Sequence, residues 1–233
     1  RIEDIPLLVE YFLALFSPET KVRIADRVMH CLQNYHWPTA LYGIPPQYTI
    51  GTELVYRYDQ ETAFWGGNEY LNFDTSDLRV PTVAISSIEF KDLYHHYLFP
   101  NRYRDSEVYT YFPDINGDFV IRTLQGQNNS RESEYSWVHF TLPYTDRLGL
   151  DKMYVYGKFN NYALEDLNQM EFNRETGNME AKLLLKQGFY NFKYVIERED
   201  GTVELNTVCG NFHFTENTYT ILVYYRNFGD IYD

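Results

Sequence analysis

The chain has 233 residues and a formal net charge of -13, and 44% of its residues are hydrophobic. This length suits one large or two small domains, and the apolar content is enough to bury a core. The negative charge is spread along the chain and repels nucleic acid and anionic membrane surfaces, so neither is expected as a partner. The chain has no run of 18 apolar residues and begins with Arg rather than Met, so we read no membrane span or signal peptide and expect a fragment.

Aromatic residues are abundant, with 23 Tyr and 16 Phe. Such residues favour strands and protein interfaces, so the composition predicts a mainly β fold. The two cysteines, Cys31 and Cys209, form no CxxC motif, which excludes a structural zinc site. They are compatible either with one long-range disulfide or with two buried thiols.

The first 18 residues carry the clearest helical pattern. Ile5, Leu8, Phe12 and Phe16 recur at helical spacing, and Ser17-Pro18 ends the run. We therefore expect an amphipathic helix over 1–18 that docks its apolar face on a sheet. Residues 19–35 fit either a helix or a strand.

Residues 1–38 resemble the helical lid of bacterial sigma-54-dependent activators. The resemblance is carried by the run from Arg1 to Leu13 and by Val28-Met, Leu32, Asn34-Tyr35 and Trp37-Pro38. The chain has no GxxxxGK[ST] loop to cradle the phosphates of ATP, which excludes an ATPase.

Residues 19–125 are expected to form a first β-sandwich-like domain, complete or incomplete. Strands are predicted over 54–58, 83–85, 93–99, 108–112 and 119–122, at spacings typical of a sandwich. Within this domain, Phe64-Trp65-Gly-Gly-Asn68 predicts a tight turn with an aromatic pair. Trp65 either folds back onto the core or forms a contact site. The polar segment 126–134 reads as a linker to a second domain.

The segment Asp114-Ile-Asn-Gly-Asp118 has alternating oxygen-bearing side chains that suggest calcium. It lacks the distal bidentate Glu of an EF-hand loop. An Asn-Gly hairpin turn between 109–112 and 119–121 explains the same residues and is preferred.

Residues 135–233 show the period-two alternation of half-buried antiparallel strands. The alternation runs over 137–142, and it recurs over 181–185 and 189–195 around a Gln187-Gly188 turn. The predicted core positions of this second sandwich are Trp137, Phe140, Tyr154, Leu183, Leu185, Phe192 and Val223.

The string Gly157-Lys-Phe-Asn-Asn-Tyr162, followed later by Gly188-Phe-Tyr-Asn-Phe-Lys-Tyr194, resembles early-set immunoglobulin-like domains. Glycogen-binding modules belong to that group. The resemblance implies an early-set sandwich over 135–233. It also supplies an alternative function, a carbohydrate-binding module with Tyr162 as the stacking platform.

No catalytic constellation is found in the sequence. The six His lack any accompanying Gly-x-Ser-x-Gly or catalytic-Cys signature, so we expect no enzyme, no cofactor and no metal site. His139 and His213 are expected inside strands. His95 and His96 are expected on opposite faces of a strand, which prevents them from sharing a metal.

From about residue 27 onward, the chain resembles the plug protein of the Bacteroidetes type IX secretion system. The matching strings are Leu32-Gln-Asn with Trp37, Leu41 to Gln47, Gly51 to Tyr56, Phe64 to Tyr70, Asp114 to Gly117, Tyr135 to Pro143, Leu183 to Val195 and Tyr219 to Arg226. Residues 1–26 depart from this family and fit the activator lid better.

This second resemblance implies a periplasmic, outer-membrane-associated protein that is not an enzyme. It implies that the protein binds and closes the outer-membrane translocon, without inserting into the membrane and without a small-molecule substrate. Rigid aromatic residues dominate protein interfaces, so we expect Phe64, Trp65 and Tyr162 to contact the partner.

Overall fold

The computed structural model describes residues 41, 44–51, 53–60, 62–143 and 149–217. Its contacts divide the chain into two compact units, Arg1–Phe64 with Tyr219–Asp233, and Trp65–Thr218. The helix expected over 1–18, the ambiguous segment 19–35 and the core position Val223 lie outside the described residues.

The described part of the first unit contains a short antiparallel hairpin. Strand β1 (Tyr48–Ile50) pairs with β2 (Glu53–Val55), with Tyr48 opposite Val55. The backbone of Gly51, just after β1, has a φ of 61°, a left-handed conformation that glycine adopts without strain. The strand predicted over 54–58 corresponds to β2, which begins one residue earlier, at Glu53, and ends at Val55.

The second unit contains a mixed five-stranded sheet in the order β4-β5-β7-β10-β9. Strands β5 and β7 run parallel, and the other neighbours in this sheet run antiparallel. The longest pairing joins β7 to β10 from Tyr135 opposite Lys186 to Pro143 opposite Asn178. The strands are β4 (Ile85–Phe90), β5 (Tyr94–Leu98), β7 (Tyr135–Pro143), β9 (Glu171–Asn173) and β10 (Asn178–Lys186).

The other sheet of the second unit is antiparallel and is built on β11 (Gly188–Glu197). The first half of β11 pairs with β3 (Leu71–Asp74) and β6 (Phe119–Ile121). Its second half pairs with β8 (Lys152–Tyr156) and β12 (Val203–Glu204). With neighbours on both edges, β11 is buried without interruption from Tyr190 to Ile196.

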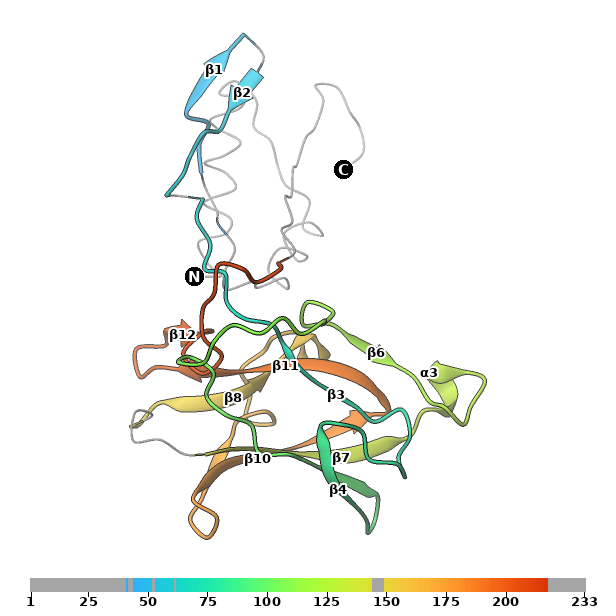
Figure 1. Cartoon of the computed structure of the whole chain (residues 1–233). Coiled ribbons are helices and arrows are strands. Elements are labelled where there is room, and N and C mark those ends of the chain that lie inside the picture. Colours follow the sequence, from blue (N-terminus) through green and yellow to red (C-terminus); the bar gives the residue numbers. More distant parts are fainter. Residues whose placement is uncertain (1–40, 42–43, 52, 61, 144–148, 218–233) are drawn as a thin grey trace. The chain divides into compact units, whose positions relative to one another are not determined.

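The main hydrophobic core lies between these two sheets, which Figure 1 shows one over the other. Val138, Phe140 and Leu142 alternate with half-exposed residues along β7 and turn inward, as the period of a strand dictates. Phe140 meets both Phe73 and Phe192 of the antiparallel sheet, with ring centroids 5.7 and 5.1 Å apart in edge-to-face arrangements.

A second, smaller cluster covers the other face of β8. It combines Tyr154 and Tyr156 with Val195 of β11, and Tyr162 packs against it. Tyr162 follows the short 3-10 helix η3 (Lys158–Asn160). Strand β8 is therefore buried on both faces.

Four of the predicted core positions are buried: Phe140, Tyr154, Leu183 and Phe192. Leu185 is only partly buried, at the edge of the main core. Trp137 was predicted wrongly, because it lies on the outer face of the mixed sheet, with Lys182 Nζ 4.0 Å from its ring centroid. Trp137 and Phe140 are three residues apart, and an odd separation places two strand residues on opposite faces.

The mainly β character is confirmed, but the sheets are not divided at 126–134. Strands β3 and β6, which precede this segment, pair with β11, and β5 pairs with β7. The segment itself holds a short helix, α3 (Asn129–Glu132), whose first turn is capped by the Asn128 side chain. Strands on both sides of 126–134 thus share one core.

Two local predictions also differ from the structure. The strand predicted over 108–112 is irregular in the structure. Strands β10 and β11 were expected to meet at a Gln187-Gly188 turn, but they belong to different sheets, so this turn is a crossover between sheets.

Candidate interaction surface

Two segments far apart in sequence, 65–70 and 206–217, are joined by hydrogen bonds in the second unit. The carbonyl of Gly67 accepts from the amide of Phe212 at 2.7 Å, and the amide of Gly67 donates to Asn211 Oδ1 at 2.8 Å. The side chain of Asn68 donates to the carbonyl of Cys209 at 2.6 Å. Cys209 is buried with a free thiol. These bonds fix the backbone that directly follows Trp65.

The two glycines of this segment are needed for that close approach. A Cβ atom on Gly66 would lie 2.1 Å from the carbonyl oxygen of Phe212, and Gly67 has a left-handed φ of 67°. Trp65 precedes them directly and is 80% exposed. Trp65 therefore does not fold back onto the core, and a fixed backbone presents its ring to solvent.

Other aromatic side chains lie on the second of these segments, 206–217, and on residues 109–112, whose Tyr109 contacts it. The ring of Tyr109 lies 5.6 Å from that of Phe212 and 6.1 Å from that of Phe214. Phe214 is 69% exposed, and Tyr111 and Phe112 are each 58% exposed. We call this set the aromatic surface: Trp65, Tyr109, Tyr111, Phe112, Phe212 and Phe214. An exposed apolar set of this kind is typical of a protein interface.

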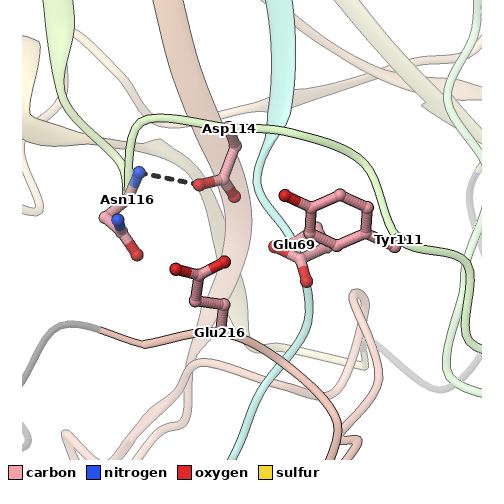
Figure 2. Close-up of a pocket in the computed structure, with 5 residues that line it drawn as sticks. All are labelled: Glu69, Tyr111, Asp114, Asn116 and Glu216. Atoms are coloured by element: carbon pink, nitrogen blue, oxygen red, sulfur yellow. Dashed lines mark hydrogen bonds between the residues drawn. The ribbon is translucent and has the colours of Figure 1, made fainter.

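An acidic pocket adjoins the aromatic surface and shares Tyr111 with it. Figure 2 shows the carboxylates of Glu69, Asp114 and Glu216 around one space, with Asn116 at its edge. Glu69 Oε1 accepts a 2.5 Å hydrogen bond from the Tyr109 hydroxyl. That bond raises the pKa of Tyr109 to about 12, since losing the proton would leave two negative oxygens in contact.

The Asn116-Gly117 turn that borders the pocket is confirmed as a turn. Both residues have positive φ, and the amide of Asp118 donates to the carbonyl of Ile115 at 3.1 Å. The side-chain oxygen of the buried Asn191, on β11, accepts from the Ile115 amide at 2.7 Å. Residues 109–112 form no strand, so the turn leads into β6 from an irregular segment.

The oxygen-rich character of this loop is explained by backbone contacts. The two carboxylate oxygens of Asp114 accept from the amides of Tyr70, at 2.5 Å, and Asn116, at 2.7 Å. Within the part of the chain that the structure describes, no group of three or more His, Cys, Asp or Glu side chains is placed to hold a metal ion.

A buried cation, Lys193, lies among the residues behind the pocket. Its Nζ is 4.1 Å from the ring centroid of Tyr70, the residue after Glu69. Burial lowers the pKa of Lys193, while the charges of Asp114 and Glu69 act in the opposite direction. Burial also raises the pKa of Tyr70. The carboxylates of the pocket thus help to keep this ammonium charged.

The three residues expected to bind a partner differ in their surroundings. Trp65 lies on the aromatic surface, and Phe64, directly before it in the chain, is 44% exposed and is assigned to the first unit. Tyr162 lies in the second hydrophobic cluster, where its ring packs 5.2 Å from that of Tyr156, and burial raises its pKa to about 12. The ring of Tyr162 is therefore partly buried against this cluster.

Sequence reasoning missed most of the aromatic surface. His213 was expected inside a strand, but it lies in a turn with Phe214, where the two ring centroids are 3.9 Å apart with the ring planes tilted by 36°. Tyr111 and Phe112 were likewise assigned to a strand. Only the Trp-Gly-Gly string pointed to this region, because paired glycines after an exposed-type aromatic indicate a close backbone approach.

The comparisons with known proteins give one family match and one structural likeness. Residues 1–39 match the AAA+ ATPase lid domain, which agrees with the resemblance of this segment to an activator lid. No curated protein sequence matches the chain. Among the described residues, no helix has the length and apolar character needed to cross a bilayer.

The structural likeness is to a hypothetical protein from Parabacteroides merdae. The two share 28% sequence identity, and the TM-score is 0.73. The likeness covers 78% of this chain and 46% of the other, so the chain spans about half the length of that protein. The chain is thus similar, over most of its length, to part of a Bacteroidetes protein.

Proposed function

We propose that the chain is part of a plug protein of the type IX secretion system. In this proposal it is a non-enzymatic, periplasmic protein-interaction module that docks on the outer-membrane translocon and closes it. The observation that carries the proposal is Trp65, which is 80% exposed on a backbone fixed by long-range hydrogen bonds. Exposed Trp on a rigid scaffold is a frequent anchor of protein interfaces.

The position of the matching strings supports this proposal. Two of them, Phe64 to Tyr70 and Asp114 to Gly117, supply Glu69, Asp114 and Asn116 to the same acidic pocket. Packing of a core explains the strings in β7 and β11. Glu69 is buried and Asp114 accepts from the backbone amides of Tyr70 and Asn116, so these two strings build the scaffold that adjoins the aromatic surface.

The structural likeness to the Parabacteroides merdae protein adds support of a general kind. That protein comes from a bacterium of the group in which type IX secretion is found, and it shares the fold at 28% identity. That protein is described only as hypothetical. The likeness therefore supports only the fold and the bacterial group, and the translocon is proposed from the matching strings.

The fold part of the proposal is an immunoglobulin-like sandwich of the early-set kind. Its support is the pair of five-stranded sheets that share one core. Strands from both sides of residues 126–134 belong to it, so the proposed sandwich spans the second unit rather than 135–233 alone.

The test is co-purification of the full-length parent protein with the translocon from its own host. Wild type is compared with Trp65→Ala and with Leu167→Ala, a control whose side chain is also 80% exposed. Losing a Trp anchor commonly costs about 2 kcal/mol or more, roughly thirtyfold in affinity. We expect loss of the translocon with Trp65→Ala only.

Two other outcomes have distinct meanings. If wild type recovers no translocon, the plug assignment is wrong. If Trp65→Ala recovers as much as wild type, the choice of Trp65 as the anchor is wrong, and the rest of the aromatic surface becomes the next target.

A further inference from the structure

Two imidazoles face each other on the outer side of the mixed sheet. His95 Nδ1, on β5, lies 3.0 Å from His139 Nε2, on β7, and the ring centroids are 5.2 Å apart. These two distances place the nitrogens in line between the rings. A proton fits between them, whereas a metal ion would need lone pairs that converge on a third point.

Asp92 limits the protonation states that this pair can adopt. His95 Nε2 lies 3.2 Å from Asp92 Oδ1, so the N–H on that side points at the carboxylate. If His95 is neutral, its Nδ1 accepts from His139. If His95 is protonated, its Nδ1 donates to a neutral His139. A proton on both facing nitrogens would place two N–H groups head to head at hydrogen-bond distance.

Charged neighbours reinforce this restriction. Lys91 follows β4 and Lys182 lies on β10, opposite His139, and both disfavour a second positive charge. The carboxylate of Glu89, on β4, favours a positive charge on His139. However, it already forms an ion pair with Lys91 and accepts a hydrogen bond from the Tyr97 hydroxyl. Burial lowers the pKa of His139 to about 4, and electrostatic coupling to His95, Lys182 and Lys91 acts in the same direction.

The inner side of the same strand pair carries a third histidine. His96 is fully buried, and its Nε2 lies 3.2 Å from the carbonyl of Leu78. Its Nδ1 and the neighbouring Ser136 Oγ are buried without a hydrogen-bond partner. Burial lowers the pKa of His96 as well. Histidines that resist protonation therefore lie on both faces of one strand pair.

That strand pair is the parallel joint of the mixed sheet. The β5–β7 register runs from Tyr94 opposite Ser136 to Tyr97 opposite His139, and it connects the β4–β5 hairpin to β7 and β10. Parallel pairing is slightly less stable per residue than antiparallel pairing. Side-chain contacts across this joint, including the Tyr97–His139 stack at 4.2 Å, therefore matter to its stability.

We propose that the β5–β7 joint is an acid-sensitive latch, in which protonation of His139, which faces His95 across the joint, releases the β4–β5 hairpin from the rest of the sheet. In the released state the ring of His139 can bind a proton that its buried contact with His95 disfavours in the closed state. The closed joint is fully stable above about pH 6.5, the ordinary pKa of His. Its stability falls as the pH decreases from there toward 4, because the open form binds more protons.

The direct test is amide hydrogen exchange on the whole chain at pH 7 and pH 5, with protection corrected for the intrinsic rate at each pH. We expect protection of β4 and β5 to fall at least tenfold at pH 5, while β7, β10 and β11 keep theirs. Uniform loss across both sheets, or no loss in β4 and β5, would overturn the proposal.

A variant separates the latch from general acid sensitivity. His139→Gln keeps a polar side chain but cannot titrate, so the pH dependence of β4–β5 protection should become weaker. His213→Gln, which removes an exposed histidine beside Phe214 and away from the β5–β7 joint, should behave like wild type. If His139→Gln responds to pH as wild type does, the latch is not at His139.

Ring nitrogen NMR of the wild type keeps the proposal testable if His139→Gln does not fold. The proposal expects His139 to stay neutral at pH 5 while the hairpin is closed and to take up a proton together with the loss of β4–β5 protection. Independent titration of His139 near pH 6.5, with no change in protection, would contradict it.

Discussion

Leu183, Leu184 and Leu185 follow one another on β10 and differ in burial. Leu183 is 7% exposed in the main core, Leu185 is half-buried at its edge, and Leu184 is 45% exposed on the outer face. We expect Leu183→Ala to lower the free energy of unfolding by about 2 to 5 kcal/mol, because the surrounding rings cannot fill the cavity. Leu185→Ala should cost less, and Leu184→Ala should change stability by about 0.5 kcal/mol or less.

Denaturant unfolding of the three variants checks this order. If Leu185→Ala were as damaging as Leu183→Ala, β10 would turn its C-terminal end further into the core than the structure shows.

At the residue scale, the alternation of side chains identified most core positions and failed where it was not applied strictly. Phe140, Leu183 and Phe192 were found because large apolar residues recur at even spacing. Trp137 was included although it is an odd number of residues from Phe140. The His95–His139 contact joins residues 44 positions apart, so no local pattern could reveal it.

At the element scale, the crossover at Gln187-Gly188 decides how the two sheets connect. Gln187 is 2% exposed. Its backbone amide donates to the carbonyl of Glu134, and its side-chain nitrogen donates to the carbonyl of Ser76. A Cβ on Gly188 would lie 2.3 Å from the carbonyl of Val120 on β6. These contacts hold β10 and β11 in separate sheets.

We therefore expect Gly188→Ala to be more destabilising than Gly177→Ala. A Cβ at Gly177 would meet no atom within 4 Å, so that variant suffers only from its left-handed φ of 70°. At Gly188 the new atom must push β6 away from β11, which breaks the pairing of Gly188 with Ile121. Thermal or denaturant unfolding of both variants measures the difference, and equal costs would show that β6 can move aside freely.

The same crossover shows what sequence patterns can and cannot supply for elements. The period-two runs correctly predicted that β10 and β11 are strands. A short Gln-Gly connection between two strands is typical of a hairpin, and the contacts that prevent one come from Ser76, Val120 and Glu134. The local sequence was enough to predict which residues form strands, whereas the pairing of those strands depends on contacts with residues far away in the sequence.

At the scale of the whole molecule, the position of the domain boundary has consequences for function. Trp65 begins the second unit, and the aromatic surface and acidic pocket draw on residues from 65 to 216, so every segment of the surface lies in that unit. A polar, glycine-bearing stretch such as 126–134 is typical of a linker. Composition could not show that strands before and after it pair with each other.

The strand pairing makes the boundary testable with two fragments. Residues 65–218 contain the complete second unit and are expected to unfold in one cooperative transition. Residues 135–218 lack β3 and β6, which pair with the first half of β11, and β5, which pairs with β7. Without them, Tyr190 loses the stacked rings of Phe73 and Phe119, and Phe140 loses the ring of Phe73, so this shorter fragment should not fold.

Far-ultraviolet circular dichroism during denaturant titration distinguishes the two fragments. A sharp transition for 65–218 and a gradual change for 135–218 would agree with the shared core. A transition of the same sharpness and midpoint for 135–218 would mean that the strands before 126–134 add little to the core. The linker expected from the sequence would then be the real boundary, and the aromatic surface would belong to two independently folding parts.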